Sequence, residues 1–125
     1  MPEYIAVFTA GAAAYAALEI IWRGWTHWTM LLCGGTCFTL MYLIESAPIR
    51  PQRKLIASAS VITAVEFVTG CIVNLKLGMA VWDYSYLPFN LMGQICPRFS
   101  LMWLGLSVPG LWLCRSIRRL FSRLQ

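Results

Sequence analysis

Residues 81–97 read Val-Trp-Asp-Tyr-Ser-Tyr-Leu-Pro-Phe-Asn-Leu-Met-Gly-Gln-Ile-Cys-Pro, and this stretch decides how the rest of the chain is interpreted. It is too apolar for a solvated loop, yet its Pro, Gly, Asn and Asp residues do not suit a spanning helix. It follows a long apolar segment that carries Glu66 near its centre. Polar groups and irregular backbone beside a bilayer are costly unless they are buried in protein or line a wet cavity. The stretch therefore predicts a site at the membrane.

The composition predicts an integral membrane protein. Hydrophobic residues make up 59% of the 125 residues and charged residues only 12%, against about a quarter charged in soluble domains. This length predicts a single domain, residues 1–125. The net charge is +5, but the basic residues flank apolar segments as they do in membrane proteins, so we do not expect nucleic-acid binding. The first residues lack the basic region of a signal peptide, so we expect the first apolar segment to remain as an anchor.

Four apolar segments predict an all-α membrane protein with four transmembrane helices. Each is close to the roughly 20 residues that cross the hydrocarbon core. The irregular stretch between the third and fourth helices is then an outer segment, which we expect to be either a lid or a re-entrant element. Within it, residues 90–95 are expected to form a short helix or a re-entrant piece. The four segments are residues 4–22, 26–44, 55–75 and 99–117.

The basic residues predict the orientation. Four spans place both termini and the loop between the second and third spans on one side of the membrane. That side carries seven basic residues, Arg50, Arg53, Lys54, Arg115, Arg118, Arg119 and Arg123. The other side carries three, Arg23, Lys76 and Arg98. Positive charge favours the cytoplasmic side, so we expect a protein of the plasma (inner) membrane with both termini in the cytoplasm.

The third span carries a stripe of polar and small residues. At 100° per residue the stripe covers an arc of about 120°. Its members are Ser60, Thr63, Glu66, Gly70 and Asn74. A carboxylate at the depth of Glu66 should face the bundle interior and be protonated or partnered by a cation or a hydrogen-bond donor. Two interpretations stay open: a ligand for a cation, proton or polar substrate, or a hydrogen bond that holds the helices together.

Two further acidic residues lie near predicted helix ends. Glu19 and Arg23 are spaced i, i+4, which favours an ion pair that either softens a helix end or takes part in substrate binding. Glu45 lies at the inner end of the second span, where we expect it to meet Arg50 and Arg53.

Tryptophan and cysteine are both frequent, but neither predicts a separate site. Four tryptophans lie near the outer boundary, where we interpret them as an interfacial belt in preference to an aromatic cage for a cation. They are Trp22, Trp25, Trp28 and Trp82. The five cysteines are an odd number and lie mostly within spans, so we expect no disulfide framework. Cys33 and Cys37 lie one turn apart near His27 and Met30; a soft-metal path is possible there, but we favour two small buried hydrophobes.

The order of several short blocks resembles a known family. The blocks are Glu66-Phe67-Val68-Thr69-Gly70, Asn74, Trp82-Asp83-Tyr84-Ser85, Pro88-Phe89-Asn90, Gly93-Gln94-Ile95-Cys96, Phe99-Ser100 and Trp103. With a looser match at Glu19, Arg23-Gly24 and Gly34-Gly35, most of the chain resembles the Putative ABC-transporter type IV, or CmpB-like, membrane proteins. The resemblance implies a compact multi-helix integral membrane protein. The 125 residues hold no nucleotide-binding domain and no phosphate loop, so the resemblance does not imply that this chain uses ATP.

We expect a small transporter or channel-like protein in the lipid bilayer that handles a small polar or ionic solute. Its polar cavity would lie beneath the outer segment and be lined by Glu66, Asn74, Asp83, Asn90 and Gln94. The alternative is a non-transporting membrane module that binds a partner protein or a lipid. We expect no enzyme, cofactor or metal, because His27, the only histidine, lies at a helix end with no paired nucleophile. Four short helices leave little room for a path, so we expect a parallel homo-oligomer, either a homodimer, which we favour, or a larger assembly.

Overall fold

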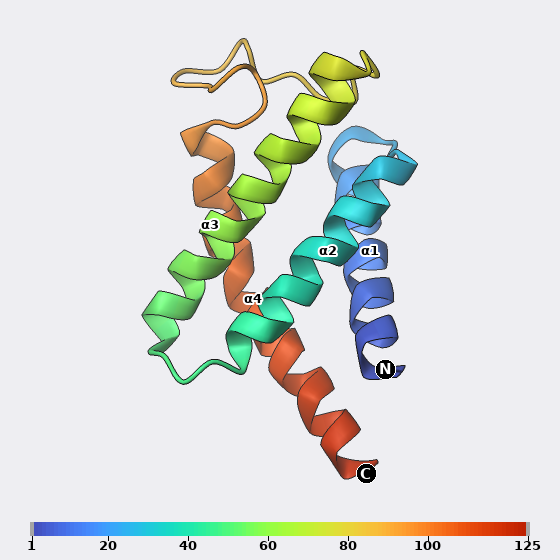
Figure 1. Ribbon diagram of the computed structural model, residues 1–125, viewed down its shortest axis with the longest axis vertical. Helices are drawn as coiled ribbons and strands as arrows, with labels where there is room; N and C mark the ends of the chain where they lie inside the picture. Colours follow the sequence, from blue (N-terminus) through green and yellow to red (C-terminus); the bar gives the residue numbers. More distant parts are fainter. Residues whose placement is uncertain (1, 125) are drawn as a thin grey trace.

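The chain folds into four long helices, seen here in a computed structural model that describes residues 2–124. The third helix continues into a π-helix, η1, and the described residues hold no strand beyond the isolated bridge between Leu91 and Ile95. The helices are α1 (Pro2–Arg23), α2 (Trp28–Glu45), α3 (Pro51–Gly70), η1 (Cys71–Lys76) and α4 (Pro97–Arg123) (Figure 1). An all-helical chain was predicted from the sequence, and its helices match the four apolar segments.

Three helices, α1, α3 and α4, start earlier than the predicted spans because polar residues also belong to the helices, whereas α2 starts at Trp28, two residues later than predicted. Both α3 and α4 begin with a proline, which follows an extended residue, Arg50 or Cys96. Proline suits the first helical position because the N–H that it lacks would have no helical partner there. The apolar runs begin only at 55 and 99, so hydropathy alone places the two starts four and two residues late.

Three of these helices are long and apolar enough to cross a membrane. They are α1, α2 and the continuous α3–η1 helix, Pro51–Lys76. The fourth helix, α4, does not reach the same criterion. It is 27 residues long, contains Pro109 and carries arginines in both its first and last turns.

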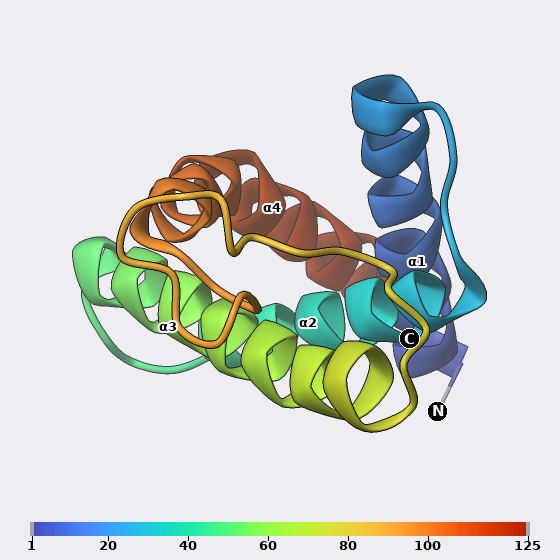
Figure 2. The same ribbon diagram turned by 90° about the horizontal axis from the view of Figure 1, so that it is seen from above.

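The helices alternate in direction, and α2 lies at the centre of the packing. α1 packs mainly on α2 and barely touches α4, whereas α3 packs on both α2 and α4 (Figure 2). The contact between α1 and α2 is close because Gly34 lies against Tyr15 and Gly35 lies against Phe8, where a Cβ would collide. The small surfaces of the first two helices are therefore used partly within the chain, and the residues that stay exposed are Ala13, Ala14 and Ala17.

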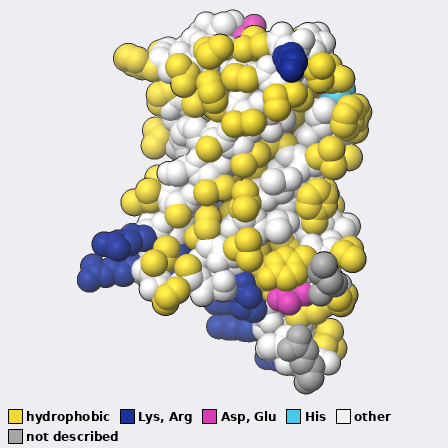
Figure 3. Space-filling view, viewed as in Figure 1, with side chains coloured by type: hydrophobic (Ala, Val, Ile, Leu, Met, Phe, Trp, Pro, Cys, Tyr) yellow, Lys and Arg dark blue, Asp and Glu magenta, His cyan; other side chains and the backbone are white. Residues whose placement is uncertain are grey.

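The start of α1, the α2–α3 loop and the end of α4 share one end of the molecule, called here the terminal end (Figure 1). Lys and Arg side chains gather there (Figure 3). Glu45, which is buried, pairs with Arg115 at 3.3 Å and with Arg118 at 3.2 Å. The expected pairing of Glu45 with Arg50 and Arg53 was wrong, because α4 runs on past the bundle and brings its own arginines to Glu45.

The opposite end, the cap end, is covered by residues 77–96, called here the cap segment (Figures 1 and 2). The cap segment is a series of turns in which Ala80, Phe89 and Met92 have positive φ angles. The short helix expected at residues 90–95 is absent from this segment. Instead, the Asn90 side chain accepts from the Gly93 N–H at 2.9 Å and donates to the Leu87 carbonyl at 2.9 Å, which closes turns in place of a helix.

Candidate functional site

The interior face of α3 places Glu66 inside the bundle. Its buried residues repeat every four positions, Ser58, Ile62, Glu66 and Gly70. Ser60, which the sequence placed on the same stripe, is exposed. The 120° arc of the stripe is wider than the face that α2 and α4 cover, and Ser60 lies at its edge.

Both carboxylate oxygens of Glu66 accept a hydrogen bond from an aromatic side chain. The Tyr84 hydroxyl donates to Oε1 at 2.9 Å and the Trp103 indole Nε1 donates to Oε2 at 2.9 Å. Glu66 is only 3% exposed, and the ion pairs within residues 2–124 involve Glu19 and Glu45 but not Glu66. A single carboxylate on α3 is thus held by the cap segment and by α4, with no cationic partner in this part of the chain.

Tyr84 acts as the donor in this arrangement because its hydroxyl stays protonated. Burial, and then the nearby Glu66 carboxylate, raises the pKa of Tyr84 well above its ordinary value. Its ring stacks on Phe99 with the centroids 4.6 Å apart. Trp103 is also a donor here, because an indole N–H can donate a hydrogen bond but cannot accept one. The two donors therefore match a carboxylate, which accepts at both oxygens.

Asn74 and Gln94 bind each other and hold the cap segment on α3–η1. The Asn74 amide donates to Gln94 Oε1 at 2.8 Å, while its own Oδ1 accepts from the Val81 N–H at 2.7 Å. The Trp82 indole donates to the Gln94 carbonyl at 3.0 Å. Gly70 makes this approach possible, because a Cβ there would collide with Gln94 and Trp82. The structure thus places Asn74 and Gln94 in a latch between elements, away from the pocket described below.

Asp83 and Asn90 both shape turns of the cap segment. Asp83 is exposed, and its Oδ1 accepts from the Ser85 N–H at 2.9 Å. This backbone hydrogen bond holds the pKa of Asp83 below its ordinary value, so the carboxylate stays ionised at neutral pH. Asn90 contacts only cap-segment backbone. Of the five residues predicted for the site, Asp83 lines the pocket, Glu66 lies directly behind two of its lining residues, and Asn74, Asn90 and Gln94 do not line it.

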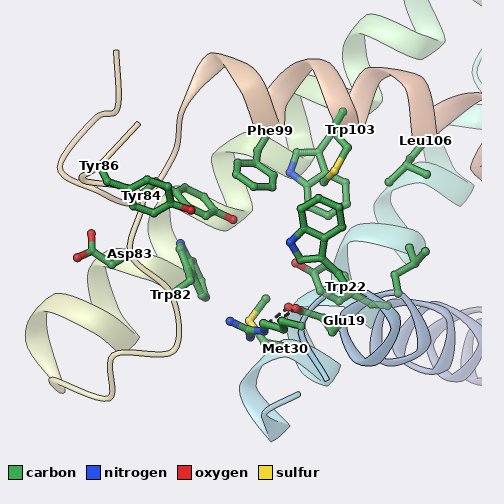
Figure 4. Close-up of a pocket in the computed structure, with 14 residues that line it drawn as sticks. Glu19, Trp22, Met30, Trp82, Asp83, Tyr84, Tyr86, Phe99, Trp103 and Leu106 are labelled. Atoms are coloured by element: carbon green, nitrogen blue, oxygen red, sulfur yellow. Dashed lines mark hydrogen bonds and ion pairs between the residues drawn. The ribbon is translucent and has the colours of Figure 1, made fainter. Parts of the chain in front are cut away.

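A pocket of about 360 Å³ lies at the cap end between α1, α4 and the cap segment (Figure 4). It forms where α1 and α4 diverge, since these two helices barely touch. Seven of its 14 lining residues are aromatic, whereas aromatic residues make up 14% of the whole chain. They are Tyr15, Trp22, Trp82, Tyr84, Tyr86, Phe99 and Trp103.

The charged side chains of the pocket are Glu19, Arg23 and Asp83. Arg23 Nε lies 2.8 Å from Glu19 Oε2, as the i, i+4 spacing predicted. Arg23 also donates to the Val81 carbonyl at 2.7 Å, and its guanidinium lies over the Trp25 ring at 3.9 Å from the centroid. The pair is therefore more than a local contact, because it ties α1 to the cap segment at the edge of the pocket.

Sequence reasoning missed the aromatic partners of Glu66. Trp103 offered a signal, since it lies inside an apolar segment where its N–H has no headgroup to bind and needs a buried acceptor. Tyr84 offered none, because a tyrosine beside a boundary is expected to face the headgroups. Of the four tryptophans interpreted as a belt, Trp22 and Trp82 line the pocket, while Trp25 contacts Arg23 and Trp28 is exposed.

Comparison with known proteins gives one match. The family described as Putative ABC-transporter type IV matches residues 4–124. Searches of curated proteins and of solved structures found no match. The match covers nearly the whole chain, and the three apolar helices agree with the membrane location that the family's description indicates. The chain is therefore a membrane protein that belongs to the Putative ABC-transporter type IV family.

Proposed function

We propose that the protein is a single four-span domain of the plasma membrane with both termini in the cytoplasm. α4 supplies the fourth span through residues 99–117, and its Arg115 and Arg118 pair with Glu45 at the terminal end, where charge is tolerated. The gathering of basic side chains at that end supports a cytoplasmic location for it (Figure 3). The cap segment and the pocket then face the outer side.

The function that the geometry supports best is transport of a small solute. One observation carries it: both hydrogen-bond donors to the buried Glu66, Tyr84 and Trp103, are also walls of the pocket. A solute that displaces Tyr84, which belongs to an irregular segment, uncovers a carboxylate in the middle of the bundle. A buried carboxylate within a membrane helix is a common ligand or proton carrier in transporters.

The second candidate is a non-transporting module that binds a partner protein or a lipid. The hydrogen bonds of the buried polar side chains favour this candidate if their role is structural. Glu66 is 3% exposed with both oxygens accepting hydrogen bonds, and Asn74 donates to Gln94. In this case the polar groups hold the helices and the cap together. Neither candidate involves enzymatic chemistry or a cofactor.

We propose a homodimer as the working assembly. The exposed small residues of α1, Ala13, Ala14 and Ala17, offer a surface for close helix packing. α1 is also the least covered of the apolar helices, since its buried residues are Val7 and Gly11.

A solute-flux screen separates the two candidates. Purified protein is reconstituted in liposomes, and uptake of a panel of labelled cations, anions and neutral polar solutes is compared with that of protein-free liposomes of the same lipid. Transport predicts protein-dependent uptake of at least one class. If folded protein gives no uptake of any class under imposed ion and proton gradients, transport is contradicted and the binding module is favoured.

A further inference from the structure

We infer, building on the proposed function in which the pocket receives the solute, that its ligand is a small organic cation with a weakly hydrated, alkylated ammonium group. The pocket walls, its charges and its size each point to this class.

The aromatic rings come from three separate parts of the fold and surround the pocket. Trp22 belongs to α1, Trp82 and Tyr86 belong to the cap segment, and Phe99 and Trp103 belong to α4 (Figure 4). Aromatic rings from three elements thus line one volume, although Tyr84 and Phe99 turn one face of each ring toward the other. Clustered aromatic rings are the groups that bind quaternary ammonium ions. Trp22 and Trp82, which the sequence placed in an interfacial belt, both line this pocket, and Trp22 is also 71% exposed.

Glu66 strengthens the attraction of the pocket for a cation, although it lies behind two lining residues and does not line the pocket itself. It accepts hydrogen bonds from the Tyr84 hydroxyl and the Trp103 indole, both at 2.9 Å. A carboxylate that accepts from these groups polarises them and makes their rings richer in electrons. The buried acid therefore contributes to binding a cation without touching it.

The charges of the lining favour a cation over an anion. The one basic residue of the lining, Arg23, is held by Glu19 at 2.8 Å and by the Val81 carbonyl at 2.7 Å. Asp83 lies at the rim, where its ionised carboxylate accepts from the Ser85 N–H and points away from the other lining side chains (Figure 4), and it forms no ion pair within residues 2–124. The charged lining residues therefore sum to one negative charge, from Glu19, Arg23 and Asp83 together.

The rest of the lining favours an organic cation over a metal ion. Leu18, Met102 and Leu106 suit alkyl groups, whereas Ca²⁺ needs six to eight oxygen ligands. No group of three metal-ligating side chains occurs in the described part of the chain. The volume of about 360 Å³ lies at the low end of the range for small-molecule pockets, roughly 300–1,000 Å³. Such a cation is available either as a free solute or as a choline-type lipid headgroup.

Calorimetric titration of the purified protein in a maltoside detergent tests the ligand class. Choline is compared with 3,3-dimethyl-1-butanol, which has the same shape but no charge. We expect choline to bind and the neutral isostere to bind at least about tenfold more weakly. Equal affinity for both, or no binding of choline or tetramethylammonium, overturns the inference.

Repeating the titration in nanodiscs distinguishes the source of the cation. Weaker choline binding in phosphatidylcholine than in phosphatidylglycerol discs indicates a lipid headgroup, and equal binding indicates a free solute.

Matched variants locate the site. Tyr86 is 76% exposed and lines the pocket, so Tyr86→Leu should weaken choline binding about threefold to tenfold while Tyr86→Phe, which keeps the ring, stays within about twofold. Asp83→Asn keeps the oxygen that accepts from Ser85 and should weaken binding severalfold. Trp112→Leu alters an exposed tryptophan outside the pocket and should change nothing. Unchanged choline binding in both Tyr86→Leu and Asp83→Asn overturns the proposed site.

The failure of the transport proposal is distinguishable from the failure of this inference. Choline binding without any solute flux contradicts the proposed transport and leaves this inference standing.

Discussion

At the scale of single residues, the two hydrogen bonds to Glu66 are the contacts on which the cap end depends. Tyr84→Phe removes only the hydroxyl that donates to Oε1 at 2.9 Å. Because one oxygen of a buried carboxylate then lacks a partner, we expect the free energy of unfolding to fall by about 1–3 kcal/mol. Thermal or denaturant unfolding in detergent measures the change.

The matched control is Tyr86→Phe, since the Tyr86 side chain lies on the same segment and is 76% exposed. Its unfolding free energy should stay within about 0.5 kcal/mol of the wild type. The loss caused by Tyr84→Phe should also shrink in a Glu66→Gln background, because the two side chains interact. Equal stability of Tyr84→Phe and Tyr86→Phe would mean that the bond to Glu66 contributes nothing.

At the scale of the elements, Asn74 is one of the residues that hold the cap segment on α3–η1. Asn74 accepts from the Val81 N–H at 2.7 Å and donates to Gln94 at 2.8 Å. We therefore expect Asn74→Ala to speed amide hydrogen exchange within residues 77–96 by about tenfold or more, with α1 and α2 unchanged. Exchange mass spectrometry resolves the segments, and Lys76→Ala, at an exposed neighbouring position, is the control. Faster exchange throughout the molecule, or none in the cap, would show that Asn74 is not a local latch.

At the scale of the whole molecule, the orientation decides which compartment the pocket faces. Gln52 at the terminal end and Ser85 in the cap segment are both exposed, whereas four of the five native cysteines are buried. With the termini in the cytoplasm, an impermeant thiol reagent added to intact cells should label Ser85→Cys and leave Gln52→Cys unlabelled. The wild-type protein, with half-buried Cys71, gives the background. Efficient labelling of Gln52→Cys from outside would reverse the orientation.

The helices could be predicted because each is an apolar run bounded by proline, glycine or charge. Hydropathy could not predict the first turns of α3 and α4, which begin at Pro51 and Pro97. Polar residues there take part in the helical backbone hydrogen bonds although they lie outside the apolar run. The cap segment was predicted to be irregular from its composition. The turns that Asn90 closes could not be predicted, because the same side chain serves a turn or a helix end equally well.

The candidate site was predictable only in part. The burial of Glu66 follows from an acid within an apolar helix, and the structure places it inside. Whether Asn74 and Gln94 face a cavity or each other depends on how closely the cap approaches Gly70, which is a tertiary distance that no local pattern encodes. The aromatic pocket likewise combines residues from α1, the cap segment and α4, and their meeting depends on the divergence of two helices.

Glu66 has two possible roles, a working carboxylate or structural support, and we propose the first. The Glu66→Gln variant separates the two roles. The amide fits the site, because its oxygen accepts from Trp103 while its nitrogen donates to the Tyr84 oxygen, which is able to accept. We expect stability within about 1 kcal/mol of the wild type. Ser60→Ala, on the exposed edge of α3, is the control for both stability and uptake.

The decisive measurement is liposome uptake by the Glu66→Gln variant of a solute that the wild type transports, made on protein whose unfolding has been checked. We expect a folded variant whose protein-dependent uptake falls about tenfold or more, since a neutral amide at the same place neither attracts a cation nor carries a proton. A normally folded Glu66→Gln variant with uptake equal to that of the wild type and of Ser60→Ala would contradict this expectation.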